Sequence, residues 1–148
     1  MLNPTGTKAI FLTRDGRAVT NSNIKRTGKS SSVASKAWRF TNIYTMRLLK
    51  TLPEESYLHI TYEELCRDPK KTLNTICTYI GIEFESEMLE IFGDDQHNIG
   101  GNRMRMKSDA RIREDLKWRD LMSKRELSDF EKIAGNLNKQ LLGSYYQP

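Results

Sequence analysis

Hydrophobic positions along the chain predict two short strands joined by helices. Residues 9–12 form a continuous apolar run, typical of a buried strand, and residues 57–62 alternate with a β-rich composition that predicts a second strand. Between them, apolar residues recur at helical spacing from about Ser32 to Leu52, and Pro53 ends this helix because the residue before a proline avoids the helical conformation. The face expected to pack into the core, with Trp38 as its anchor, consists of Val33, Ala37, Trp38, Thr41, Tyr44, Leu48 and Leu52.

Two further helices are predicted after the second strand. Asp68-Pro69 is typical of an N-cap followed by proline at the first helical position, and Gly81 is a good stop for this helix. Ser123 and Glu126 make a capping box that begins a closing helix, which Gly143 ends. The apolar faces are Leu73, Ile76, Cys77 and Ile80 in the first helix, and Leu127, Phe130, Ala134, Leu137 and Leu141 in the second.

The connections between these elements are rich in charged residues and turn formers. Residues 25–32 are basic and low in hydrophobicity, so a flexible loop is predicted there, and residues 63–65 are expected to form a charged turn. Residues 86–92 suit one or two helical turns. Residues 93–113 have little periodicity, and a long loop of this kind in a compact domain is commonly functional. Residues 1–7 are expected to be disordered or linker-like.

Composition places the chain among soluble proteins with a single domain. The 148 residues are about one domain's worth, 37% of them are hydrophobic and 29% are charged. No apolar run approaches the ~20 residues of a membrane span, and the N-terminus lacks the features of a signal peptide, so a cytoplasmic location is expected. Cys66 and Cys77 have no metal-ligand spacing and are interpreted as reduced thiols. The net charge of +5 fits either an anionic partner or a mildly basic surface.

A first candidate site lies where the chain leaves the first strand. Arg14 stands at the carboxyl end of that strand, and Ser22 comes eight residues later, in the early turns of a helix expected to start near Ala18. α/β proteins bind phosphate groups where a strand, a loop and a helix follow in this order, since backbone N–H groups and the positive helix end face the anion there. Arg14 and Ser22 could both reach one phosphate. From the local sequence alone, a phosphate site and an ordinary turn both remain open.

Two further candidates lie at the end of the second strand and in the long loop. Tyr62 ends the second strand, and a parallel neighbour would bring it close to the carboxyl end of the first strand; a purely structural tyrosine is the alternative. Gly101, Asn102 and Arg105 lie in the loop, where glycines let backbone N–H groups approach an anion and Arg105 can supply a bidentate contact. No Walker-type loop, metal-ligand spacing or nucleophile elbow accompanies them. The sequence therefore offers parts for holding a polyanionic ligand.

Taken in order, four segments and the C-terminal tail resemble the sulfotransferase family, whose members use 3′-phosphoadenosine 5′-phosphosulfate (PAPS). Ile10–Ser22 is similar to the family's strand, loop and helix that bind the 3′-phosphate. Tyr62–Pro69 is similar to its Tyr-Glu-Asp-Leu…Asp-Pro segment, and Leu73–Phe84 to the helix and Leu-Gly-x-x-Phe motif that follow. His97–Arg105 resembles a loop of the bacterial and carbohydrate-type branches, and Trp118–Tyr146 resembles the family's C-terminal Trp and closing helix.

The resemblance implies an α/β fold, here a partial P-loop-NTPase-like arrangement of three layers with few parallel strands between amphipathic helices. It also implies transfer of a sulfuryl group from PAPS to a hydroxyl or amine acceptor, such as a carbohydrate, a lipid or a small molecule, with PAP as the product and no metal. It implies that Arg14, Ser22 and Arg105 hold the 3′-phosphate of the nucleotide. Gly101 and Asn102 would also approach the nucleotide, and Tyr62 would lie near the adenine. No residue is assigned as the catalytic base.

One part of the family's pattern has no counterpart in this sequence. The family's N-terminal strand, the Gly-rich loop that cradles the 5′-phosphosulfate and the catalytic base all precede the matched segments. Residues 1–148 are therefore expected to form a single, N-terminally truncated domain whose partner is a missing N-terminal half. The alternative hypothesis is a non-catalytic basic module that binds nucleic acid or another polyanion. Nucleic acid is the less favoured partner because basic residues are spread along the chain without stacking aromatics.

Overall fold

Two parallel strands lie at the centre of the protein, which a computed structural model describes over residues 6–89 and 114–146. Strand β1 (Ala9–Thr13) pairs with β2 (Tyr57–Thr61), so that Ala9 lies opposite Tyr57 and Thr13 opposite Thr61. Parallel neighbours need a long crossover, and helices α1 (Gly16–Thr27) and α2 (Ser31–Leu49) supply it. Both predicted strands are thus confirmed.

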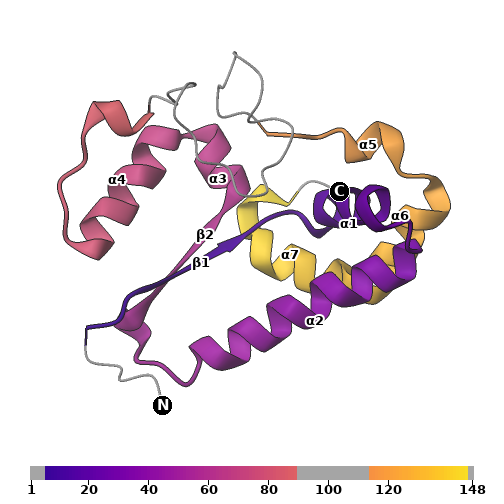
Figure 1. Ribbon diagram of the computed structural model, residues 1–148, viewed down its shortest axis with the longest axis horizontal. Helices are drawn as coiled ribbons and strands as arrows, with labels where there is room; N and C mark the ends of the chain where they lie inside the picture. Colours follow the sequence, from indigo (N-terminus) through magenta and orange to yellow (C-terminus); the bar gives the residue numbers. More distant parts are fainter. Residues whose placement is uncertain (1–5, 90–113, 147–148) are drawn as a thin grey trace.

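Helices cover the strands from two sides, as Figure 1 shows. Helix α2 and the C-terminal helix α7 (Asn136–Leu142) lie on one side, and α4 (Pro69–Ile80) lies on the other. The short helix α3 (Tyr62–Arg67) continues directly from β2 and leads into α4. This arrangement of helix, parallel sheet and helix confirms the predicted three-layer α/β fold.

The main core forms between α2 and the closing helical segment. Trp38 and Phe130 are both buried, with their ring centroids 5.7 Å apart, and Ala134 and Leu141 complete the buried cluster. Phe11 of β1 packs against this cluster from the sheet side. The predicted role of Trp38 as the core anchor of α2 is therefore confirmed.

The closing helical segment begins at the predicted capping box of Ser123 and Glu126. It comprises α6 (Lys124–Phe130), a π-helical turn (Glu131–Gly135) and α7, and the short helix α5 (Trp118–Leu121) precedes it. The remaining elements of the described chain are 3₁₀ turns at Glu54–Ser56, Ser86–Leu89 and Gly143–Tyr145. Cys66 and Cys77 are free, and no helix in residues 6–89 or 114–146 is long and apolar enough to cross a membrane.

The predicted buried face of α2 is wrong apart from Trp38. Val33, Tyr44 and Leu48 are 47%, 62% and 48% exposed, and Phe40, beside them on the same face, is 70% exposed. The residues that α2 buries are Ser31, Ala34, Ser35, Trp38, Asn42 and Leu49. Polar side chains can lie on that face because they are hydrogen-bonded within the helix: Ser35 donates to the Ser31 carbonyl at 2.7 Å and Asn42 donates to the Trp38 carbonyl at 2.8 Å.

Two predicted loops are largely helical. Helix α1 extends to Thr27 and ends at Gly28, which has a left-handed φ of 68°, and Ser30 caps α2, so residues 28–30 alone connect the two helices. The predicted charged turn after β2 is part of α3. Its N-terminus is fixed by a capping box in which Thr61 and Glu64 exchange hydrogen bonds with each other's backbone N–H.

Gly16, at the start of α1, is expected to tolerate no side chain. A Cβ atom there would lie 2.5 Å from Cζ of Phe130 and 2.8 Å from Cδ2 of Trp38. We expect Gly16→Ala to lower the free energy of unfolding by about 1–3 kcal/mol through overpacking, as measured by urea denaturation. In a Phe130→Leu background, where the clashing ring is absent, the penalty should be smaller. An equal penalty in both backgrounds would contradict the close packing of this turn against Phe130.

Candidate functional site

Arg14 and Tyr62 meet at the carboxyl edge of the sheet. Arg14 follows the last residue of β1 and Tyr62 follows the last residue of β2, and because the strands are parallel both residues lie at the same edge. The guanidinium carbon of Arg14 lies 4.4 Å from the centroid of the Tyr62 ring. The structure thus brings together the two candidates that were placed at strand ends.

The Arg14 side chain is held on two sides. Its guanidinium stacks on Tyr62, and Nη2 donates to the backbone carbonyl of Asp115 at 3.3 Å. Stacking leaves the N–H groups at the edge of the guanidinium plane able to bind a planar or tetrahedral anion in a bidentate manner. Arg14 is half-buried, so the cation is fixed in position and still accessible.

The remaining predicted residues are less closely tied to this pair. Ser22 lies on α1 and is exposed to solvent. Gly101, Asn102 and Arg105 lie outside the described residues, so the predicted loop contacts stay predictions.

The first backbone N–H groups of the turn after Arg14 already have protein acceptors. The N–H of Asp15 donates to Oε1 of Glu63 at 2.9 Å, that of Gly16 donates to Oδ1 of Asn138 at 2.7 Å, and that of Arg17 donates to Oδ1 of Asp15 at 2.8 Å. The expectation that N–H groups at this helix start face an anion is therefore wrong for these three residues. An anion bound here would be held by side chains.

A buried ion pair fixes the same turn. Nη2 of Arg17 lies 2.7 Å from Oδ2 of Asp15, and both side chains are at most one-tenth exposed. The Arg17 guanidinium also lies over the rings of Trp118, at 4.1 Å, and Tyr146, at 5.0 Å. Arg17 is thus directed into the C-terminal part of the chain, and it braces the turn beside Arg14.

Burial shapes the protonation states around Arg14. It raises the pKa of the Tyr62 phenol above its usual range, with a smaller contribution from a hydrogen bond with the Cys66 side chain, so the phenol is neutral at physiological pH. It also raises the pKa of Glu63, against the opposing effect of the hydrogen bond from the Asp15 N–H. Oε2 of Glu63 is buried without a hydrogen-bond partner among the described residues.

His59 adds no cation to this edge of the sheet at neutral pH. Its Nε2 and Oγ1 of Thr13 lie 2.8 Å apart, and partial burial lowers the pKa of the imidazole despite the nearby Glu64 carboxylate. Among residues 6–89 and 114–146, no group of three or more His, Cys, Asp and Glu side chains is placed to hold a metal ion.

Two residues of the site were missed by sequence reasoning. Glu63 was assigned to a charged turn, and Asn138 was not singled out at all. The Thr61-x-x-Glu64 capping box could have revealed the helix that orients Glu63. No local signal could have found Asn138, because its partners Asp15 and Gly16 lie 123 and 122 residues away in the sequence.

Comparisons with known proteins point to a single family. A family model described as the sulfotransferase family matches residues 6–86, more than half of the chain. The sulfotransferase domain from the curacin biosynthetic pathway is similar over 97% of this chain and 55% of its own, with 26% identity and a TM-score of 0.67. The sulfotransferase domain from the olefin synthase of Synechococcus PCC 7002 is similar over 95% of this chain and 50% of its own, with 25% identity and a TM-score of 0.58. The chain thus spans about half the length of these domains. A comparison with curated proteins finds no match.

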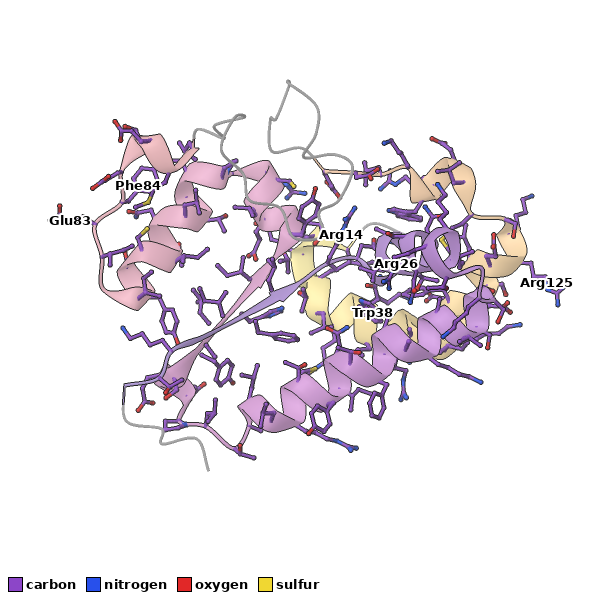
Figure 2. All side chains as sticks on the ribbon, viewed as in Figure 1. Arg14, Arg26, Trp38, Glu83, Phe84 and Arg125 are labelled. Carbon is purple, nitrogen blue, oxygen red and sulfur yellow. The ribbon has the colours of Figure 1, made fainter. Side chains whose placement is uncertain are left out.

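Glu63→Gln is expected to stabilise the protein at neutral pH, because the amide keeps an acceptor for the Asp15 N–H and removes a buried charge. The pKa of Glu63 is raised above its ordinary value of 4.5, so the wild type loses stability relative to the variant as the pH rises from about 4.5 through the folded-state pKa. The wild-type melting temperature minus that of the variant should therefore become more negative between about pH 4.5 and pH 7.5. Glu83→Gln, at an exposed position at the other side of the molecule (Figure 2), controls for the loss of one charge. A difference that stays constant over this pH range would contradict the burial of an ionised Glu63.

Proposed function

The chain belongs to the sulfotransferase family, and from this premise we propose that it binds PAPS and its product PAP by their 3′-phosphate and adenine. The observation that carries the proposal is the fixed position of Arg14 at the carboxyl edge of the sheet, against Tyr62 and the carbonyl of Asp115. In open α/β sheets, ligands collect at this edge. A fixed and accessible guanidinium suits a phosphate dianion in charge and in geometry.

In the proposed complex, Arg14 binds the 3′-phosphate and the exposed hydroxyl of Ser22 donates a further hydrogen bond from α1. Arg105 adds a second guanidinium, while Gly101 and Asn102 contact the nucleotide from the loop that carries them. Tyr62 adjoins the adenine. Its neutral phenol adds no charge next to the phosphates.

The reaction we propose is transfer of a sulfuryl group to a hydroxyl or amine of a carbohydrate, a lipid or a small molecule. A bond forms between the acceptor atom and sulfur, the bond from sulfur to the 5′-phosphate oxygen breaks, and PAP leaves with the negative charge. The described residues contribute by holding the donor at its 3′ end, which fixes its position for in-line attack. The base that takes the acceptor's proton is not assigned to any of them.

We further propose that residues 1–148 correspond to the C-terminal part of a longer sulfotransferase domain and act with its N-terminal half. The two similar domains are about twice as long as this chain. In the described chain β1 pairs with β2 alone, and its Ile10 and Leu12 are 45% and 55% exposed. Their register partners Leu58 and Ile60 are better covered, on the side where α4 packs. Parallel strands are normally covered on both faces, so the bare face of β1 fits a strand and helix from such a half.

Binding of PAP is expected to raise the melting temperature of the wild-type chain, since a ligand that binds the folded state alone stabilises it by about 2.7 kcal/mol at 100 times its Kd. Arg14→Ala should abolish this shift in differential scanning fluorimetry. Arg125→Ala is the matched control, because Arg125 is exposed and projects from the far end of the molecule (Figure 2), so the shift should be retained.

Two results would contradict this proposal. One is a folded wild-type sample that millimolar PAP does not stabilise. The other is a salt-sensitive gel shift with nucleic acid that Arg14→Ala leaves undiminished, which would favour the basic module instead.

Ser22→Ala is expected to weaken PAP binding about tenfold, because a hydrogen bond to a charged group contributes about 1.5 kcal/mol. Isothermal titration calorimetry would measure the change in Kd. Ser86→Ala removes another exposed hydroxyl and should leave Kd unaltered. If both variants bind PAP as the wild type does, Ser22 does not belong to the site, although Arg14 still can.

A further inference from the structure

Asn138 is fully buried on α7 and uses both halves of its amide at the turn after Arg14. Its Oδ1 accepts from the N–H of Gly16 at 2.7 Å, and its Nδ2 donates to Oδ1 of Asp15 at 3.2 Å. The exposed fraction of the residue is 0%. A polar side chain is buried to this extent at little cost only when it is fully hydrogen-bonded.

An amide is well suited to this position because the turn presents one donor and one acceptor side by side. The Gly16 N–H needs an acceptor. The Asp15 carboxylate accepts from Arg17 at both oxygens, and the Asn138 amide adds a donor from another helix to Oδ1. An aliphatic side chain would leave the Gly16 N–H without this acceptor and would remove one donor from the Asp15 carboxylate. A carboxylate would place an ionised oxygen beside that of Asp15.

The turn is also fixed from the opposite direction. Glu63 of α3 accepts from the N–H of Asp15 at 2.9 Å, and Glu63 adjoins Tyr62, on which the Arg14 guanidinium stacks. The backbone before Arg14 is held in the strand ladder, where Thr13 lies opposite Thr61. The partly exposed Arg14 therefore projects from a stretch whose backbone is fixed on both sides.

We propose that Asn138 is a positioning residue for nucleotide binding: from the C-terminal helix it holds the turn of Asp15 and Gly16, and thereby the backbone from which Arg14 reaches the 3′-phosphate. This inference rests on the proposed function. It assigns a role to a residue outside the 6–86 segment that the family model matches. It also makes α7, at the opposite end of the chain from β1, a part of the nucleotide site.

The test compares PAP affinity with stability in the full 148-residue chain. Asn138→Ala is expected to raise the Kd for PAP more than tenfold, measured by calorimetry well below the melting temperature of the variant. Leu141→Ala is the destabilised control, since Leu141 lies on the same helix and is buried in the Trp38 cluster. It should lower the melting temperature and leave Kd within about twofold. Asn136→Ala, at an exposed position of α7, should change neither quantity.

Asn138→Asp tests the positioning role through the pH dependence of PAP binding, which a purely structural role would not produce. It also provides a test if the alanine variant fails to fold. A protonated carboxyl has one acceptor and one O–H donor and can replace the amide, whereas the ionised form repels Asp15. The Kd of this variant divided by the wild-type Kd should therefore be large near pH 8 and approach one near pH 5, with circular dichroism confirming a folded chain at both.

The possible failures are distinguishable. If the wild type binds PAP and both Asn138 variants bind it equally well, the positioning role is wrong and the proposed function stands. A Kd ratio for Asn138→Asp that is large and does not change with pH would also overturn the role. If the wild type does not bind PAP, the proposed function is wrong and this inference falls with it.

Discussion

The buried carboxylate of Asp15 is the constraint on which the site depends. A charge removed from water must be paired and hydrogen-bonded, and Asp15 achieves this with the guanidinium of Arg17 and the amide of Asn138. Arg17 in turn lies over Trp118 and Tyr146. One short turn therefore ties the C-terminal segments to the sheet, through the rings that lie against Arg17 and through the amide of Asn138.

The same pairing determines what kind of anion site this can be. At many phosphate sites the N–H groups of a helix start bind the ligand directly. Here those of Asp15, Gly16 and Arg17 are used internally, so the anion site that we propose would rest on side chains. A guanidinium fork and a hydroxyl are more selective for the geometry of a terminal phosphate than a helix end is, because their donors have fixed directions. The internal hydrogen bonds are thus consistent with binding one phosphate of a larger nucleotide.

The sequence predicted the features that depend on residues close together in the chain, and it missed those that depend on the tertiary fold. The Ser123–Glu126 capping box, the Asp68-Pro69 helix start and the strand periods depend on neighbouring residues, and the structure confirms them. The meeting of Arg14 and Tyr62 was also predictable, since both follow strands that prove to be parallel. The buried face of α2 was not, because Ser35 and Asn42 look polar in the sequence and satisfy their hydrogen bonds within the helix. Asn138 was hidden for another reason: only the tertiary fold brings it to Asp15.

Binding the donor and transferring the sulfuryl group make different demands, and we propose that the described chain serves the first. Holding a phosphate requires a cation fixed before the ligand arrives, so that little conformational entropy is lost on binding. The stacked Arg14 and its fixed turn provide this. Transfer also requires a base and donors at the reacting end of the nucleotide. Because β1 has a free edge in the described two-stranded sheet, a strand added along it would lie beside the end of β1 that leads to Arg14, where we propose that the nucleotide binds. The half of the domain that we propose to complete the fold would thus also be the half that completes the chemistry.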